Sequence, residues 1–299
     1  MAKNYTGTEM ILNINSILPS YALIDCGNGN KLERFGDKIL IRPELSATGI
    51  QTLSLHEWEE MAHARFTETG NNQGKWEYFG DRFTEWETML PIHEKKLAVR
   101  LQLSSFKHVG IFPEQAVNWE YLLSQKPGNN DENKLLNLFG YTGIASLFAA
   151  AGGFSVTHVD SLKQVVERGK EMMHRNNLDG IRWIVDDARD FVRREMKRGN
   201  RYRGVILDPP AAGKGSKGRF WKLEKDLAPL LADIKTLLLP DGFLIMSLYA
   251  GFAGIPYITA LATSLFADAH IETCDEIIGQ TAEGKSISHG VLLRLIVHG

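Results

Sequence analysis

Short apolar runs alternate with longer stretches of helical spacing through the second half of the chain. Leu135–Leu138 is the first such run, and the small and apolar residues of Gly143–Ala151 follow it. The pattern predicts further strands at Val156–Val159, Ile181–Val185, Gly204–Leu207 and Gly242–Ser247, and helices at Leu162–Asn176, Ala188–Arg198, Glu224–Leu238 and Tyr257–Ala267. Such alternation is typical of βαβ units around a mostly parallel sheet, with helices on both faces.

The last two predicted strands depart from this alternation. Cys274–Ile278 and Val291–Val297 are separated by a glycine-bearing connection from Gly279 to Gly290, without a helical stretch. We therefore expect an antiparallel hairpin as the last part of the sheet.

The first 85 or so residues have a different texture, with short alternating runs and turns. The pattern predicts strands at Tyr21–Cys26, Lys31–Phe35, Lys38–Arg42 and Trp76–Phe79, and a helix at Leu55–Phe66. Gly27 to Asn30 is turn chemistry, and Pro43 ends a strand because proline lacks the N–H. We predict a small β-rich N-terminal domain at residues 1–90 and a second domain at residues 91–299.

The second domain is expected to begin with an extension at residues 91–133. Leu97–Ser104 and His108–Phe112 are predicted to form a hairpin, and Ala116–Ser124 a helix. Residues 126–133 are polar and are predicted to form a loop.

Composition narrows the class of protein. The chain has 299 residues, 43% hydrophobic and 23% charged, which is ordinary for a globular protein. Its two cysteines, Cys26 and Cys274, make neither a disulfide framework nor a zinc ligand set. The net charge of −2 excludes a globally basic nucleic-acid binder, so any nucleic-acid surface must be a local patch.

Targeting and metal signals are not evident in the sequence. We find no signal peptide pattern and no apolar run of the roughly 18 residues that a membrane span needs. The expected location is the cytoplasm, with no membrane partner. The histidines are scattered without metal-ligand spacing, so no metal site is predicted.

Candidate ligands follow the predicted strands, because doubly wound sheets bind ligands beyond the carboxyl ends of their strands. The first strand leads into Asn137-Leu-Phe-Gly-Tyr-Thr-Gly143, whose glycines allow backbone to approach a ligand but also suit a tight turn. Asp160 follows the second strand, twenty positions after Gly140, a spacing at which an acid meets ribose hydroxyls. It could equally cap the helix that follows.

The third and fourth strands also end in carboxylates. Asp186-Asp187-Ala188 could accept a hydrogen bond from an adenine amino group or cap a helix. Asp208-Pro209-Pro210 is the sharpest signal, because two prolines force a rigid elbow and hold the Asp at the strand tip.

Together these segments resemble the class I methyltransferases that use S-adenosylmethionine (SAM). Leu135–Gly143, Val156–Asp160 and Val185–Ala188 are similar to their first three motifs, and Asp208-Pro-Pro to their catalytic motif. The resemblance covers about residues 95–299 and implies a Rossmann-like, seven-stranded α/β sheet. It implies Asp208, Pro209 and Pro210 as catalytic residues. It implies cofactor contacts from Phe112, Gln115, Asn137, Phe139, Gly140, Tyr141, Thr142, Gly143, Asp160, Ser161, Asp186, Asp187, Ala188 and Asp208.

A closer resemblance is to the bacterial large-subunit ribosomal RNA methyltransferases, especially the cytosine-C5 enzymes and their paralogues. It rests on Asn137 to Gly143, on Gly110-Ile-Phe-Pro-Glu-Gln115, which in that family folds over SAM, and on the basic loop after Asp-Pro-Pro. The chain departs from the family pattern at Ala116, where an Arg is usual, and at Ala211-Ala212.

A third departure concerns the chemistry. The cytosine-C5 enzymes carry a nucleophilic Cys after the fifth strand, where this chain has Ser247-Leu-Tyr-Ala-Gly251. Methylation at a pyrimidine C5 requires covalent activation, normally by a thiolate. We therefore expect transfer to an amine or oxygen, with Asp208 and the Pro209 carbonyl accepting bonds from an exocyclic amine.

The segment after the elbow suggests a substrate surface. Residues 213–222 are basic, glycine-rich and aromatic, which suits phosphate contacts and base stacking. The predicted substrate contacts are Lys214, Lys217, Arg219, Phe220 and Trp221. A second basic run, residues 193–203, is as well explained by a solvated helix end.

Three functions remain open on the sequence. The first is methylation of an RNA base, with ribosomal RNA as partner. The second is methylation of a protein or small molecule. The third, a nicotinamide-dependent oxidoreductase or a non-catalytic nucleotide-binding module, lacks the Gly-x-Gly-x-x-Gly fingerprint and leaves Asp208-Pro-Pro without a role.

Overall fold

The computed structural model describes residues 9–12, 14–70, 73–125, 133–215, 218–249 and 251–298. The chain divides into two compact units. The C-terminal unit comprises Asn118–Ile277 and Gly290–Gly299 together with Met1–Met10, and the N-terminal unit comprises Ile11–Val117 and Ile278–His289. The predicted boundary at residue 90 falls inside strand β7, Glu85–Ile92, so residues up to Val117 group with the N-terminal unit.

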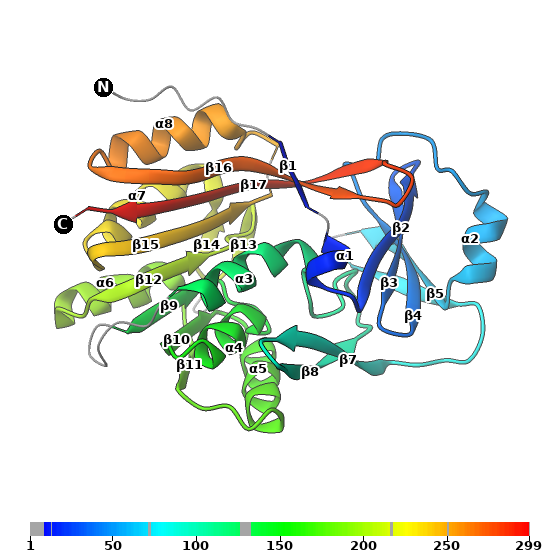
Figure 1. Cartoon of the computed structure of the whole chain (residues 1–299), viewed down its shortest axis with the longest axis horizontal. Helices are drawn as coiled ribbons and strands as arrows, with labels where there is room; N and C mark the ends of the chain where they lie inside the picture. The colour runs from blue at the N-terminus through cyan, green and yellow to red at the C-terminus, as the bar shows by residue number, and fades with distance from the viewer. Residues whose placement is uncertain are drawn as a thin grey trace. The chain divides into compact units, whose positions relative to one another are not determined.

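The C-terminal unit is built on a mostly parallel sheet (Figure 1). Within the described ranges the sheet has eight strands in the order β1-β16-β17-β15-β12-β9-β10-β11. Their bounds are β1 Glu9–Leu12, β9 Lys134–Leu138, β10 Ser155–Asp160, β11 Ile181–Val185, β12 Tyr202–Leu207, β15 Leu238–Leu248, β16 Ala269–Gln280 and β17 Ser286–Val297. Seven are the predicted strands; the last two, β16 and β17, are neighbours in the sheet, and β17 runs antiparallel to β15. The edge strand β1 is an addition that the pattern does not indicate.

Six helices of the described chain flank this sheet. They are α3 Ala116–Ser124, α4 Ile144–Ala151, α5 Lys163–Arg175, α6 Ala188–Arg198, α7 Leu223–Lys235 and α8 Ile255–Leu265. The layer of α3, α4 and α5 covers one face, and α6, α7 and α8 cover the other (Figure 1). Because both faces are covered, the central strands are continuous apolar runs, with Leu138, Val205, Leu207 and Leu244 fully buried. The predicted α/β class is confirmed.

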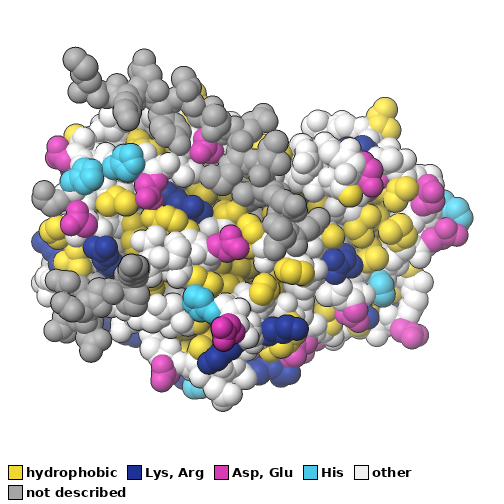
Figure 2. All heavy atoms as spheres, viewed as in Figure 1, with side chains coloured by type: hydrophobic (Ala, Val, Ile, Leu, Met, Phe, Trp, Pro, Cys, Tyr) yellow, Lys and Arg dark blue, Asp and Glu magenta, His cyan; other side chains and the backbone are white. Residues whose placement is uncertain are grey.

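The N-terminal unit is β-rich, as predicted. Its five-stranded sheet has the order β2-β3-β4-β5-β6, and β7 and β8 form a separate hairpin. The bounds are α1 Ile14–Ile17, β2 Tyr21–Gly27, β3 Asn30–Phe35, β4 Lys38–Pro43, α2 Leu55–Met61, β5 Ala64–Gly70, β6 Gln73–Tyr78, β7 Glu85–Ile92, β8 Lys95–Gln102 and the 3-10 turn η1 Pro113–Gln115. Hydrophobic side chains lie between charged ones over this sheet on the face seen in Figure 2.

Two predicted elements of this unit are wrong. The helix predicted for Leu55–Phe66 ends at Met61, because the following residues alternate and pair with β6, Phe66 lying opposite Trp76. The predicted strand His108–Phe112 is irregular. Lys95–Gln102 pairs instead with Glu85–Ile92, a partner that the sequence pattern does not reveal.

A buried ion pair holds the N-terminal sheet together. Glu33, fully buried on β3, accepts bonds from Arg42 Nε at 2.8 Å and from Tyr21 Oη at 2.8 Å. Burial alone would raise the pKa of Glu33, but the nearby Arg42 and Lys31 cations outweigh it and leave that pKa below its usual value. The carboxylate is therefore charged in the folded protein and needs its partners.

We predict that Glu33→Ala lowers the free energy of unfolding by about 3–5 kcal/mol, since it strands the buried Arg42 cation. Because the pKa of Glu33 is lowered on folding, its contribution is present above the unfolded pKa and is lost as pH falls through the folded pKa. Urea denaturation measured across pH tests both statements. The matched control is Glu85→Ala, which removes an exposed pair with Arg100 and should cost under about 1 kcal/mol. A similar cost for both variants would contradict the prediction.

None of the helices in the described ranges is long and apolar enough to cross a lipid bilayer.

Candidate active site

Strand register brings the predicted site residues to one edge of the large sheet. Leu138 on β9 lies beside Val159 of β10 on one side and Leu207 of β12 on the other. Phe139, Asp160 and Asp208 therefore leave three neighbouring strands at the same level. Asp160 pairs in turn with Val185, the residue before Asp186.

A cavity lies at this edge, inside the C-terminal unit. It is lined by Phe139, Val159, Asp160, Ser161, Asp186, Asp187, Ala188, Pro210, Gly213, Gly215 and Trp221. Most of these were predicted as cofactor or catalytic residues. Asn137, Gly140, Tyr141, Thr142 and Gly143 lie in or beside the loop that borders the cavity but are not part of its lining.

The loop after β9 has an unusual backbone. Phe139 and Tyr141 have positive φ of 56° and 50°, a region that non-glycine residues rarely adopt. The loop is held by hydrogen bonds from Gly140 N to Val159 O at 3.1 Å and from Tyr141 N to Asp160 Oδ2 at 2.9 Å. The predicted turn between β9 and α4 is therefore hydrogen-bonded to Asp160 at the tip of β10.

Two aromatic rings packed against this loop require glycine at two of its positions. A Cβ at Gly140 would lie 2.4 Å from His158 Cε1, and one at Gly143 would lie 2.6 Å from the Trp183 ring. Side chains at either position would collide with these rings. The glycines therefore let the loop lie close against the sheet, which places Phe139 in the cavity wall.

His158 is a residue that sequence analysis missed. It is fully buried on β10, and its Nδ1 lies 3.0 Å from Ser146 Oγ, which also accepts from Asn137 Nδ2 at 2.9 Å. Burial lowers the pKa of His158 to about 3, so the ring is neutral at physiological pH. Asn137, predicted as a cofactor contact, belongs to this network below the loop.

Asp160 makes backbone contacts on both sides of the tip of β10. Its Oδ1 accepts from Leu162 N at 2.9 Å, at the start of α5, while its other oxygen holds the loop at Tyr141. Burial raises the pKa of this carboxyl, against the opposing effect of these backbone bonds. It also lines the cavity, and its contact with ribose hydroxyls stays a prediction.

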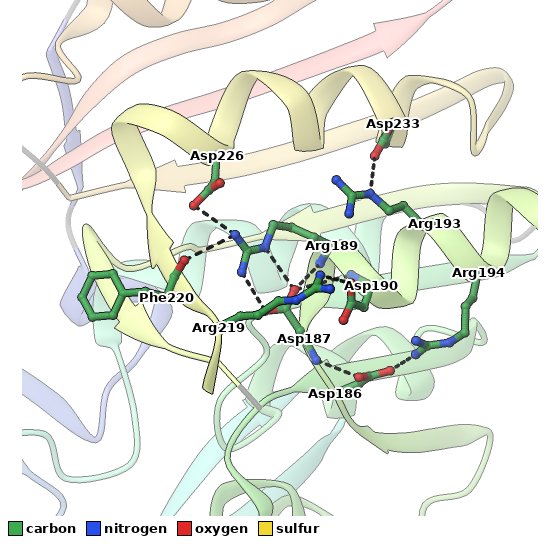
Figure 3. A network of polar contacts seen from close by, with 10 residues as sticks. All are labelled: Asp186, Asp187, Arg189, Asp190, Arg193, Arg194, Arg219, Phe220, Asp226 and Asp233. Atoms are coloured by element: carbon green, nitrogen blue, oxygen red, sulfur yellow. Dashed lines mark hydrogen bonds and ion pairs between the residues drawn. The ribbon is translucent and has the colours of Figure 1, made fainter. Parts of the chain in front are cut away.

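Asp187 and Asp186 bind different partners. Asp187 caps α6, accepting from Arg189 N at 3.0 Å, and pairs with the Arg189 guanidinium at 2.9 Å. These bonds and the Arg189 charge lower the pKa of Asp187, although burial opposes them. Asp186 accepts from Asp187 N at 3.0 Å and forms an ion pair with Arg194 (Figure 3). The helix-cap interpretation therefore holds for Asp187.

Trp221 joins the elbow to the cavity wall. Its indole Nε1 donates to Pro210 O at 2.7 Å, and its ring centroid lies 4.9 Å from that of Phe139. Arg189 lies over the ring at 5.6 Å. Sequence analysis predicted Trp221 as a substrate contact. The side chain is only 4% exposed and lines the cavity.

The other predicted substrate residues differ in their exposure and in their partners. Arg219 pairs with Asp190 at 2.6 Å, and Phe220 on β14, Phe220–Lys222, is 57% exposed (Figure 3). Lys214 lies on β13, Ala212–Lys214, which pairs with β14, and Lys217 lies outside the described residues.

Three of the six cations in the second basic run form ion pairs with acids. Arg193 pairs with Asp233 at 3.7 Å, Arg194 with Asp186, and Arg198 with Glu195 at 2.7 Å (Figure 3 shows the first two). These pairs favour the interpretation of this run as the polar face and end of α6.

The remaining predicted residues lie at the elbow and in the other unit. Asp208 is half-buried directly after β12, Pro209 is buried, and Pro210 is the residue of the elbow that lines the cavity. Phe112 and Gln115 belong to the N-terminal unit, so their contact with a cofactor stays a prediction. In the part of the chain that the structure describes, no cluster of three or more His, Cys, Asp or Glu is arranged to hold a metal ion.

Residues 71–267 match the S-adenosylmethionine-dependent methyltransferase family. The crystal structure of a SAM-dependent methyltransferase from Agrobacterium tumefaciens is 30% identical, with a TM-score of 0.86 over 98% of this chain and 94% of that one. The structure of SMU.776, solved with SAH, shares the fold at 17% identity, with a TM-score of 0.74 over 94% of this chain and 76% of that chain.

Among curated proteins, ribosomal RNA large subunit methyltransferase K/L from Shewanella frigidimarina is 30% identical over 152 residues. That alignment covers 50% of this chain and 20% of the relative, so the chain spans about a fifth of that protein's length. The family match over residues 71–267, on a sheet whose strand tips carry the cavity described above, shows that this chain belongs to the SAM-dependent methyltransferase family.

Proposed function

We propose that this enzyme transfers a methyl group from SAM to a base of large-subunit ribosomal RNA. The observation that carries the proposal is the cavity at the strand tips, whose lining includes Asp160 and Pro210 of the Asp208-Pro-Pro elbow. Relatives named as ribosomal RNA large subunit methyltransferases support the choice of RNA as substrate. Because the chain spans only 20–24% of those relatives, their names support this substrate but do not establish it. Such a substrate would place the enzyme in the cytoplasm.

The cavity has the chemistry that SAM requires. Asp160 supplies an acceptor for ribose hydroxyls, and Ala188 and Phe139 supply apolar surfaces for an adenine ring. When bound, SAM supplies an electrophilic methyl group on its sulfonium sulfur. The protein then has to orient the acceptor atom and exclude water, since proximity accounts for much of the rate of such transfers.

Neither cysteine is suited to act as a nucleophile. Cys274 is buried on β16, which is separated from β12 by β17 and β15, and burial raises the pKa of its thiol. Cys26 is also buried, in the N-terminal unit, and burial together with the charge of Asp25 raises its pKa. These thiols stay protonated at neutral pH, so we propose a nitrogen or oxygen acceptor instead of a pyrimidine C5.

Asp208 is the proposed contact to the acceptor. It leaves β12 at the cavity edge, and the following prolines fix its backbone. The Pro210 carbonyl already accepts a bond from Trp221, which anchors the elbow from behind. The carboxylate is therefore held by a rigid turn and can accept a hydrogen bond from an exocyclic amine.

Exposed aromatic side chains offer surfaces for RNA bases. Phe220 is 57% exposed, and Tyr249, directly after β15, is 50% exposed. Leu207 of β12 pairs with Met246 of β15, so Tyr249 leaves the sheet at the same edge as Asp208. Stacking on such rings contributes to the binding of single-stranded bases and tolerates any base, because every base has a π-face.

Labelled methyl transfer tests the proposed substrate. Radiolabelled SAM would be incubated with total RNA, protein and metabolite fractions from cells that lack this gene. We expect label in large ribosomal RNA, on a nitrogen or oxygen atom in nucleoside analysis. Label confined to protein or metabolites would sink the RNA proposal, and label on a pyrimidine C5 would sink the proposed chemistry.

The role of Asp160 is tested by Asp160→Asn. We expect SAM affinity to fall about tenfold or more, because a hydrogen bond to a charged group is worth about 1.5–3 kcal/mol. Since burial raises the pKa of Asp160, wild-type affinity should decline on acidification at a higher pH than for an ordinary Asp, while the variant stays flat. Calorimetric titration measures both, with exposed Asp179→Asn as control. Equal affinities for variant and wild type would remove Asp160 from the site.

Asp208→Ala should lower kcat/KM about 100- to 1000-fold while SAM affinity stays within about twofold, as expected when one oriented polar contact is lost. Single-turnover kinetics with labelled SAM measure the first quantity and calorimetry the second. Asp179→Ala serves as the matched surface control. Wild-type turnover in Asp208→Ala with SAM bound would rule out the proposed contact.

A further inference from the structure

A second cavity lies wholly within the N-terminal unit. Its volume is about 330 Å³, and it is lined by Asn30, Ile41, Pro43, Gln51, Leu55, Trp58, Arg65, Phe66, Thr67 and Glu68. It shares no lining residue with the proposed SAM site, whose lining belongs to the C-terminal unit. A volume of this size is at the lower end of small-ligand pockets, which run from about 300 to 1,000 Å³.

The cavity exists because two strands part. β4 and β5 pair in parallel only at Leu40–Ala64 and Ile41–Arg65. Pro43, at the end of β4, has no N–H with which to continue the ladder. The residues beyond, Pro43 on one strand and Phe66 to Glu68 on the other, form facing walls of the cavity.

The walls combine apolar planes with neutral polar groups. Trp58, fully buried, and Phe66, 3% exposed, close the bottom of the cavity, and Leu55 at its rim is 52% exposed. Asn30 and Gln51 contribute amides. Gln51 Oε1 accepts from Asn28 Nδ2 at 3.2 Å, a bond that does not use the Gln51 amide hydrogens.

The charges of the lining are already matched. Arg65 pairs with Glu59 at 2.5 Å and lies over the Phe79 ring at 5.3 Å, and Glu68 lies 4.0 Å from Lys107. A guanidinium engaged in this way is poorly suited to hold a phosphate, but its plane can still stack on a ring. The lining therefore favours a planar, uncharged group that has hydrogen-bonding edges.

A buried carboxylate holds the cavity in shape. Asp25 Oδ2 accepts from Trp58 Nε1 at 3.0 Å and from Thr52 N and Leu53 N at 2.9 Å, and Lys285 Nζ lies 3.2 Å from its other oxygen. Burial would raise the pKa of Asp25, but these bonds outweigh it, so its pKa lies below the usual value. One charged group thus fixes both the floor and the loop that carries Gln51, and such preorganisation lowers the cost of binding.

We propose that this cavity binds an unpaired nucleobase of the RNA substrate, distinct from the base that is methylated. The proposal rests on the proposed function. Sequence-specific RNA recognition uses unstacked bases held on aromatic or guanidinium planes and hydrogen-bonded at their edges. The lining supplies the partly exposed guanidinium plane of Arg65 and the amides of Asn30 and Gln51. The N-terminal unit then selects the RNA, while the C-terminal unit carries out the transfer.

Binding of fluorescein-labelled single-stranded RNA nonamers (A9, C9, G-rich and U9) tests the proposal, with saturating SAH present to fill the cofactor site. Leu55→Arg places a long side chain at the cavity rim, and Leu45→Arg makes the same change at an 84% exposed position outside the lining. We expect Leu55→Arg to weaken binding of the preferred nonamer about tenfold or more, as when one stacked base is lost, and Leu45→Arg to change it less than about twofold.

A second variant and a crosslinking experiment distinguish loss of the binding site from misfolding. Gln51→Ala removes the amide without adding volume and should weaken binding severalfold. Nonamers containing 4-thiouridine should crosslink to peptides from residues 41–68 in the wild type and in Leu45→Arg, but not in Leu55→Arg. Equal affinity in all variants, or crosslinks confined to other peptides, would overturn the proposal.

Turnover separates this inference from the proposed function. If RNA is the substrate, Leu55→Arg should raise KM for RNA about tenfold and leave kcat and SAM affinity unchanged. RNA methylation that is insensitive to Leu55→Arg would overturn the inference and leave the proposed function standing. Label found only in protein would sink the proposed function, and the nonamer experiment, which needs no turnover, would still decide whether the cavity binds a base.

Discussion

Backbone pairing between the parallel strands β10, β9, β12 and β15 is the constraint on which the site depends. Leu138 lies level with Val159 and Leu207, so Phe139, Asp160 and Asp208 leave the sheet side by side although they are far apart in the chain. A slip of one strand by a single residue would turn its side chains to the other face and withdraw its tip from the cavity. The apolar runs buried on both faces hold this register.

Two aromatic contacts then shape what the strands bring together. From below, His158 and Trp183 fill the space that Cβ atoms at Gly140 and Gly143 would need, which lets the loop lie flat with Phe139 in the wall. Opposite Phe139, Trp221 packs on its ring and anchors the Pro210 carbonyl. Three cations on α6, Arg193, Arg194 and Arg198, are paired with acids.

The N-terminal unit follows a different principle, because its small sheet is organised around buried carboxylates. Glu33 binds Arg42 and Tyr21 within the sheet, and Asp25 binds Trp58 and the backbone of the loop that follows β4. Each carboxylate has a lowered pKa because its partners outweigh the cost of burial. The charged Asp25 carboxylate holds Trp58 and this loop in place, and the cavity over Trp58 is therefore preformed.

The sequence by itself determined seven strands of the large sheet, the helices that flank them and the residues at the strand tips. Alternation of short apolar runs and helical stretches is a local signal, and Asp160, Asp186 and Asp208-Pro-Pro are found by their position after such runs. Only the tertiary structure decided that Phe66 pairs across to Trp76 in a strand, that Lys95–Gln102 pairs with Glu85–Ile92, and that His158 supports the glycine loop. It also decided that Trp221 faces inward, where the 213–222 pattern predicts a substrate contact. These facts depend on partners distant in the chain, and local periodicity carries no information about which distant residue a side chain will meet.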